Sequence, residues 1–157
     1  MEKRFYIAYG SNLNIEQMKV RCPNAKVIGT AVIKDYQLLF KGSKTGSYLT
    51  IEPHKDSSVP AAVWEISRSD EKSLDRYEGY PNFYYKKEMF INISEIISGK
   101  VIRRKAFAYI MYEEHKLGVP SPYYVKTCIN GYRTFGFDKA HIFDAIEISR
   151  RNIYENE

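Results

Sequence analysis

The most constraining feature of this sequence is a short apolar run that ends abruptly in small and polar residues. Residues 4–9 are Arg-Phe-Tyr-Ile-Ala-Tyr, a composition typical of a buried β-strand, and the tripeptide Gly-Ser-Asn at 10–12 follows at once. Residues 14–21 then have helical spacing, with Asn14 placed to cap the first turn and Arg21 as a positive charge near the C-terminal end. A strand that leads into a helix presents backbone N–H groups at the positive end of the helix. The junction therefore predicts a binding site for an anionic group.

A second informative segment is Leu-Asp-Arg-Tyr-Glu-Gly-Tyr at residues 74–80. Ser67 and Asp70 precede it with the spacing of a capping box, which predicts a helix that stops at Gly79. Glu78 then falls at the C-terminal end of this helix, where the negative pole of the helix dipole disfavours a carboxylate. We expect the pKa of Glu78 to be raised if its side chain is also buried. An anion site and a carboxyl group of shifted pKa together suit acid–base catalysis.

The remaining apolar segments predict a fold of the α+β class. Strands are expected at 26–40 (two strands or one bent strand), 48–52, 61–66, 83–93 and 101–112, the last two forming a hairpin. The polar segments between strands, 41–47 and 53–60, are expected to be loops. Further helices are expected at 123–132 and after Asp138, the latter with a core face of Ile142, Ala145, Ile146 and Ile148. Because the strands are grouped and the helices inserted singly, α+β is favoured over a parallel, doubly wound sheet.

The bulk composition is that of one ordinary globular domain, for which we expect the bounds 1–157. The chain carries 24 basic and 19 acidic residues, and its net charge of +5 is spread over short runs. Such runs are typical of solvated surfaces, so a nucleic-acid partner is not expected. The apolar runs are too short to span a membrane as a helix, so a membrane partner is not expected either.

The cysteines and histidines show no metal-binding or disulfide pattern. Cys22 and Cys128 are the only cysteines, and no secretory signal is evident, so we expect two free thiols in a reducing cytoplasm. His54, His115 and His141 are scattered singly. A metal site is therefore not expected.

Four segments, in order, resemble the γ-glutamylcyclotransferase superfamily, the AIG2-like and butirosin-deprotecting-enzyme-like group. They are Tyr-Ile-Ala-Tyr-Gly-Ser-Asn-Leu at 6–13, Val-Trp-Glu-Ile at 63–66, the 74–79 segment followed by Tyr84, and Ser-Pro-Tyr-Tyr at 121–124. The resemblance covers nearly the whole chain. It implies a small mixed β-barrel of about six strands with flanking helices and a pocket at one mouth.

The resemblance also implies which residues form the site. The general base corresponds to Glu78, and a substrate-contacting tyrosine corresponds to Tyr124. The substrate-binding loop corresponds to Tyr6, Ile7, Ala8, Tyr9, Gly10 and Ser11, and the backbone of Asn12 extends it.

The implied reaction is the cleavage of a γ-glutamyl amide by the substrate's own α-amine, which releases 5-oxoproline and a free amine or amino acid. Because the nucleophile is tethered, proximity supplies much of the acceleration, and neither a protein nucleophile nor a cofactor is expected. Glu78 would act first as base and then as acid. The N–H groups at 10–12 would hold either the substrate carboxylate or the oxyanion, and the sequence leaves both roles open.

Other interpretations remain open at this point. The amine half of the substrate could be an amino acid, a simple amine, a γ-glutamyl-linked lysine or a γ-glutamyl-protected metabolite, and loops such as 41–47, 53–60 and 113–119 are expected to line its pocket. A non-catalytic small-molecule binding module is the main alternative to an enzyme. A small basic nucleic-acid binder has only the Phe-Tyr-Tyr-Lys-Lys run at 83–87 in its favour. Both a monomer and a homodimer are compatible with the sequence.

Overall fold

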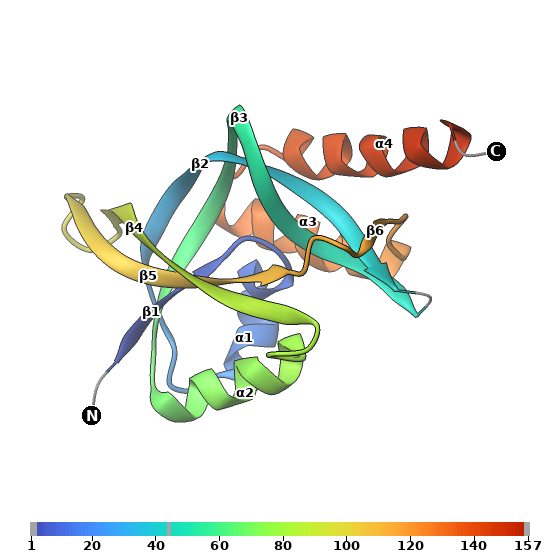
Figure 1. Cartoon of the computed structure of the whole chain (residues 1–157). Coiled ribbons are helices and arrows are strands. Elements are labelled where there is room, and N and C mark those ends of the chain that lie inside the picture. Colours follow the sequence, from blue (N-terminus) through green and yellow to red (C-terminus); the bar gives the residue numbers. More distant parts are fainter. Residues whose placement is uncertain (1–2, 44, 156–157) are drawn as a thin grey trace.

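The fold is built around a β-barrel, seen in a computed structural model that describes residues 3–43 and 45–155 (Figure 1). Five strands of the described chain close the barrel: β1 (Arg4–Ala8), β2 (Lys26–Ser43), β3 (Gly46–Ile66), β4 (Tyr84–Glu95) and β5 (Val101–Met111). A short strand, β6 (Lys116–Leu117), extends the sheet by pairing with β2.

The barrel is a mixed sheet with the strand order β3-β1-β5-β4-β2, closed by pairing of β2 with β3. The pairing of β1 with β5 is parallel, whereas the other pairings are antiparallel. Closure pairs the strands on both sides and so removes the free edges that an open sheet would leave. The α+β class and the small mixed barrel with flanking helices are therefore confirmed.

The long β2–β3 hairpin differs from the expectation in two places. Residues 26–40 form one bent strand that continues to Ser43, with register shifts at Val27/Gly29 and at Lys34/Tyr36. The expected loops at 41–47 and 53–60 are wrong, because both segments belong largely to paired strands; residue 44 lies outside the described residues. The polar side chains at 54–56 are exposed on the bend, so polar composition there does not break the strand.

The helices at the N-terminal half lie at one end of the barrel (Figure 1). They are the 3-10 helix η1 (Ser11–Leu13), α1 (Ile15–Arg21) and α2 (Arg68–Glu78). The capping box of α2 is present: Ser67 Oγ accepts from the N–H of Asp70, and the Asp70 carboxylate accepts from the N–H of Ser67. Gly79 ends α2 in the left-handed region, with a φ of 65°.

Two further helices, α3 (Pro122–Phe135) and α4 (Ala140–Glu155), pack elsewhere on the barrel. Ser121 caps α3, and Asp138 accepts a hydrogen bond from the N–H of Ala140 at 2.9 Å. Ile142 and Ala145 of the expected α4 face are fully buried, while Ile146 and Ile148 are half-buried. Among the described residues, no helix combines the length and apolar character needed to cross a membrane.

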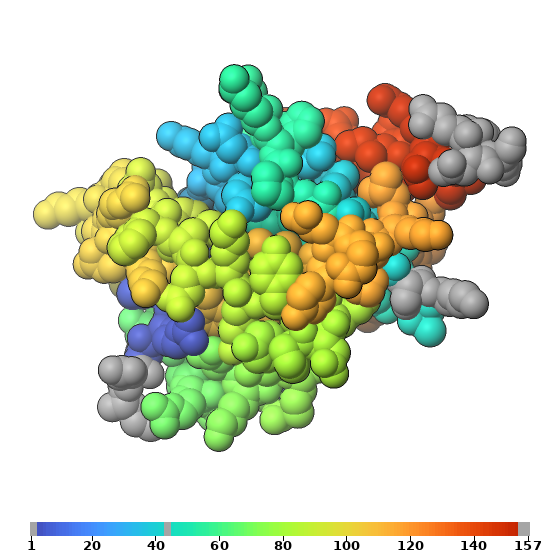
Figure 2. Space-filling view, in the orientation of Figure 1, coloured from blue at the N-terminus to red at the C-terminus, as the bar shows by residue number. Residues whose placement is uncertain are grey.

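The segments that follow α2 and β5 lie side by side on one face of the molecule. In Figure 2 the orange surface after β5 adjoins the yellow-green surface after α2. The rings of Phe83 and His115 make this contact, with centroids 4.7 Å apart. The chain after α2 is thus held over the barrel next to the cavity described below.

Candidate active site

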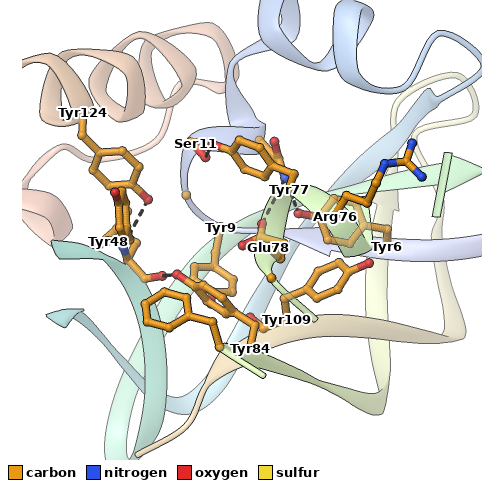
Figure 3. Close-up of a pocket in the computed structure, with 15 residues that line it drawn as sticks. Tyr6, Tyr9, Ser11, Tyr48, Arg76, Tyr77, Glu78, Tyr84, Tyr109 and Tyr124 are labelled. Atoms are coloured by element: carbon orange, nitrogen blue, oxygen red, sulfur yellow. Dashed lines mark hydrogen bonds between the residues drawn. The ribbon is translucent and has the colours of Figure 1, made fainter. Parts of the chain in front are cut away.

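A cavity of about 330 Å³ lies where the end of β1, the start of β3 and the C-terminal end of α2 meet (Figure 3). Most of its lining side chains are tyrosines. The lining residues are Tyr6, Tyr9, Gly10, Ser11, Asn12, Tyr48, Leu49, Arg76, Tyr77, Glu78, Gly79, Phe83, Tyr84, Tyr109 and Tyr124.

The structure brings most of the expected site residues to this one cavity. Glu78 and Tyr124 line it together with Tyr6, Tyr9, Gly10, Ser11 and Asn12. Ile7 and Ala8 do not line it: they are 0% and 1% exposed and belong to the barrel core. Alternation along β1 explains the contrast between Tyr6 and Ile7, because successive strand side chains point to opposite faces.

The junction after β1 is a tight turn rather than the start of an α-helix. Residues 11–13 form η1, closed by hydrogen bonds of 3.0 Å from Leu13 N–H to Gly10 C=O and from Asn14 N–H to Ser11 C=O. The α1 helix begins at Ile15 and is capped by Asn14, as expected, so the N–H groups next to Gly10 belong to η1 and not to the first turn of α1. The N–H groups that begin η1 have no partner within the turn, so the junction still offers donors of the kind expected.

Glycine at position 10 keeps this junction close to the opposite wall. A Cβ at Gly10 would lie 3.3 Å from Leu49 Cβ and 3.6 Å from the hydroxyl oxygen of Tyr124. A side chain there would therefore occupy the space between the turn and Tyr124. The absence of a side chain lets a ligand approach the backbone.

Glu78 is the last residue of α2 and is partly buried among tyrosines, with Tyr48 and Tyr124 across the cavity (Figure 3). Burial raises its pKa to about 8, and the positive charge of Arg21 opposes that rise. The side-chain N–H of Asn12 donates to Glu78 Oε1 at 3.4 Å. A carboxyl group with this pKa is present in both protonation states near neutral pH.

Hydrogen bonds between side chains tie the η1 turn to its surroundings. Asn12 Nδ2 donates to the Tyr6 hydroxyl at 2.8 Å, and the hydroxyls of Ser11 and Tyr77 lie 2.9 Å apart. Two of these partners flank Glu78, one from β1 and one from α2. The turn and the acid are therefore held in one network.

On the opposite wall, two tyrosines bond the backbone of Leu49. The Leu49 N–H donates to the Tyr124 hydroxyl at 3.1 Å, and the Tyr84 hydroxyl donates to the Leu49 carbonyl at 2.8 Å. Burial raises the pKa of both hydroxyls well above the usual value, so both stay neutral at physiological pH. Tyr124 accepts from the backbone and so keeps its own O–H proton for donation.

The α2 helix is fixed to the barrel by a charged cluster one turn before Glu78. Asp75 accepts from the Tyr109 hydroxyl at 2.6 Å and from Lys86 Nζ at 2.8 Å. Lys86 also pairs with Glu71 at 2.6 Å, and Glu71 pairs with Arg4 at 2.8 Å. These bonds join α2 to β1, β4 and β5. They therefore fix the C-terminal end of the helix, where Glu78 lies.

Close packing between α3 and η1 sets the distance between the two walls. A Cβ at Gly131 of α3 would lie 2.6 Å from Leu13 Cβ and 2.7 Å from the Leu13 carbonyl carbon. No side chain fits there unless the backbone moves. Gly131 thus permits α3, which carries Tyr124, to contact the turn directly.

Several lining residues were not expected from the sequence. The main ones are the aromatic side chains Tyr48, Tyr77, Phe83, Tyr84 and Tyr109, together with Leu49 and Arg76. Tyr84 was noted only as part of the family resemblance. The segments 41–47, 53–60 and 113–119, expected to line the amine pocket, contribute no lining residue among those described. The wall comes instead from strand ends, which bring distant residues together.

The chain is similar to known proteins both in sequence and in fold. A family model described as gamma-glutamyl cyclotransferase, AIG2-like, matches residues 6–126. The gamma-glutamylcyclotransferases of Bos taurus and Homo sapiens are each 32% identical to the chain over 145 residues, covering 86% of this chain and 73% of either relative. A solved gamma-glutamyl cyclotransferase superposes with a TM-score of 0.76 at 26% identity, covering 96% of this chain and 86% of that chain. The expected resemblance is confirmed, and the chain belongs to the AIG2-like gamma-glutamylcyclotransferase family.

Proposed function

We propose that this chain cleaves a small γ-glutamyl amide and releases 5-oxoproline and a free amine or amino acid, with Glu78 as the general base and acid. The observation that carries the proposal is the position of Glu78. Its carboxyl group has a pKa of about 8 and lines the same cavity as the η1 turn and Tyr124. These are the groups that the reaction needs at its proton-transfer and binding steps.

In the proposed reaction, the Glu78 carboxylate takes one proton from the substrate's α-ammonium group. The freed amine attacks the γ-carbonyl carbon, and a C–N bond forms as the carbonyl oxygen becomes an oxyanion. The oxyanion then collapses, the bond to the leaving nitrogen breaks, and Glu78 returns its proton to that nitrogen. The second proton, which the ring nitrogen still carries after the attack, passes to the leaving amine, so the amine departs as an ammonium ion. The five-membered ring closes readily because both reacting groups belong to one molecule, with effective molarities of about 10⁵ M or more for well-oriented groups.

The binding groups divide between the two walls of the cavity. The N–H groups of the η1 turn suit a carboxylate or an oxyanion, since they are uncharged donors in a partly enclosed site. The Tyr124 hydroxyl suits a second substrate oxygen, because it stays neutral. The aromatic side chains around them exclude water, which strengthens each of these hydrogen bonds.

The test measures 5-oxoproline release from a panel of L-γ-glutamyl amino acids and γ-glutamyl amines. We expect release by the wild-type protein and a loss of about 100-fold or more in Glu78→Gln, the range typical of a general base. Glu16→Gln is the matched control, because Glu16 is exposed on α1 with its side chain 86% accessible. Equal rates in wild type and Glu78→Gln would remove Glu78 from the mechanism. Binding without release from any substrate would favour a non-catalytic binding module.

A further inference from the structure

Arg21 was expected only as a positive charge at the end of α1, but its side chain reaches the network around Glu78. The guanidinium donates from Nη1 to Asn12 Oδ1 and from Nη2 to Gln17 Oε1, the latter at 3.3 Å. Asn12 is the residue that bonds Glu78. Arg21 is therefore one side chain removed from the proposed base.

The chemistry of the guanidinium decides which way the Asn12 side chain points. Arginine has only donors, so the atom of Asn12 that faces Arg21 must be the carbonyl oxygen. The NH₂ group of Asn12 then points the other way, toward the Tyr6 hydroxyl at 2.8 Å and Glu78 Oε1 at 3.4 Å. Without Arg21, the flipped amide would present its oxygen to the carboxylate, which is repulsive.

The aromatic ring of Tyr77 holds Arg21 in this position. The guanidinium carbon lies 3.4 Å from the centroid of the Tyr77 ring, and the Tyr77 hydroxyl contacts the Ser11 hydroxyl at 2.9 Å. A planar guanidinium stacks on a ring and bonds in its own plane at the same time, which a lysine ammonium does not do. The arrangement is therefore specific to arginine.

We propose that Arg21 is a positioning residue for the general base: it fixes the Asn12 carboxamide so that the NH₂ group faces Glu78, and it holds its charge beside that carboxyl group. The kinetic part of this inference rests on the proposed function, whereas the contacts and the titration of Glu78 do not. Arg21 itself does not line the cavity.

The positive charge of Arg21 acts on the pKa of Glu78. The groups that face Glu78 or lie near it are mostly tyrosines, with two arginines: Tyr6 of β1, Tyr9 directly after β1, Arg21 of α1, Tyr48 of β3, Arg76 and Tyr77 of α2, Tyr84 of β4, Tyr109 of β5 and Tyr124 of α3. Arg21 is the cation whose field lowers the pKa of Glu78 against the effect of burial. Removal of this charge should raise that pKa further and leave less carboxylate at neutral pH.

The first experiment titrates Glu78 in the unliganded protein by carbon-detected NMR of labelled glutamate side chains, with Glu78→Gln to assign the signal. Arg21→Gln should move the midpoint to a higher pH, and Arg21→Lys should move it less because the charge stays. Lys19→Gln is the matched control: it removes the same charge from the same turn of α1, but Lys19 is exposed and pairs only with Glu16 among the described residues. An unchanged midpoint in Arg21→Gln, or an equal shift in Lys19→Gln, would overturn the inference.

The second experiment separates positioning from charge by a double-mutant cycle. Arg21→Lys keeps the charge, so its loss of kcat/KM should come through Asn12. We expect about a 10-fold to 100-fold loss in the wild-type background, the range for a hydrogen bond to a charged group, and no further loss in the Asn12→Ala background. Equal losses in both backgrounds would show that Arg21 does not act through Asn12 and would overturn the positioning role.

The two proposals fail in different ways. If the wild type releases no 5-oxoproline but Glu78 titrates as described and responds to Arg21→Gln, the proposed function falls and the control of Glu78 by Arg21 stands. If release occurs and collapses in Glu78→Gln, but Arg21→Gln leaves both the titration and the pH profile unchanged, the function stands and this inference falls. Thermal unfolding of each variant checks that its fold is retained.

Discussion

The two walls of the cavity are built differently. On the wall formed by η1 and the end of α2, polar side chains bond one another: Asn12 bonds Tyr6 and Glu78, and Ser11 bonds Tyr77. On the wall formed by β3, β4 and α3, Tyr84 and Tyr124 both bond the backbone of Leu49. The first wall therefore depends on side-chain chemistry, whereas the second depends on shape. Substitutions should affect activity on the first wall and stability on the second.

The largest effect is expected when the acid is moved without being removed. Glu78→Asp keeps the carboxyl group but withdraws it by one methylene, so proton transfer to the substrate loses its geometry. We expect kcat/KM to fall by about 100-fold, as is typical of a displacement of about 1 Å in an active site. Steady-state kinetics of 5-oxoproline release measures this. Activity close to that of the wild type would mean that the reaction does not depend on the exact position of the carboxyl group. The first wall would then be less dependent on side-chain chemistry than we infer.

The pH dependence of the wild-type protein should report the same carboxyl group. Because burial raises the pKa of Glu78 to about 8, the base form is lost as the pH falls below that value. We expect kcat/KM to fall by about tenfold per unit of pH on this acidic side. A profile measured from about pH 3.5 to pH 9.5 tests the prediction, and an acidic limb with a midpoint near 4.5, the ordinary value for a glutamate, would contradict it.

Tyr124 is the residue of the second wall whose substitution is expected to change activity most. Tyr124→Phe removes the hydroxyl that accepts from Leu49 and that we propose donates to substrate. We expect a loss of about tenfold in kcat/KM, in line with one neutral hydrogen bond. Tyr48→Phe is the control, because Tyr48 contacts the Tyr124 ring edge-on and lines the same cavity. A loss of 1,000-fold in kcat/KM in Tyr124→Phe would show that a side chain of the second wall takes part in the reaction, as Glu78 does on the first.

The acid should also destabilise the fold when it ionises. The pKa of Glu78 is raised from 4.5 to about 8 in the folded protein, so between these values the unfolded chain binds fewer protons and stability falls as the pH rises. Glu78→Gln should therefore be more stable than the wild type at pH 8, by roughly 2 kcal/mol after allowance for the partial exposure of the side chain, and similar at pH 4. Chemical denaturation at both pH values measures this. A Glu78→Gln variant less stable than the wild type at pH 8 would contradict a buried Glu78 carboxyl group with a raised pKa.

The smallest effect on activity is expected at Tyr84. Tyr84→Phe leaves the buried carbonyl of Leu49 without this donor, so the free energy of unfolding should fall by about 1 kcal/mol. Activity should stay within about threefold of the wild type, since the ring that lines the cavity is kept. Urea denaturation measures the change in stability, and the kinetic assay measures the change in activity. A large loss of activity with unchanged stability in Tyr84→Phe would show that Tyr84 contributes to the reaction and not to stability.

Local sequence signals were enough where the structure depends on neighbouring residues. The caps at Asn14 and Ser67 and the hairpin of β4 and β5 were predicted correctly, because each is set by residues a few positions apart. The continuous strand β3 was not, because its polar segment 53–60 is held by pairing with β2, about 20 residues away. Strand propensity carries no signal for such a partner.

The site was predictable in part for the same reason. Glu78 and the turn at 10–12 belong to compact motifs, and the family resemblance linked them although they are far apart in the sequence. The tyrosines from β3, β4 and β5 were not identified, since 14 tyrosines are spread along the chain and nothing local distinguishes those that reach the cavity. Arg21 was interpreted as a helix-end charge because its contact with Asn12 depends on how η1 folds back.

The contact between Gly131 of α3 and Leu13 of η1 joins the two walls of the cavity. Because Gly131 has no side chain, α3 packs directly against Leu13 of η1, and the spacing of the two walls depends on this contact. An added methyl group at Gly131 would clash with Leu13 and force the two walls apart, although Gly131 does not line the cavity. The size of the cavity should thus respond to a substitution at a residue that does not line it.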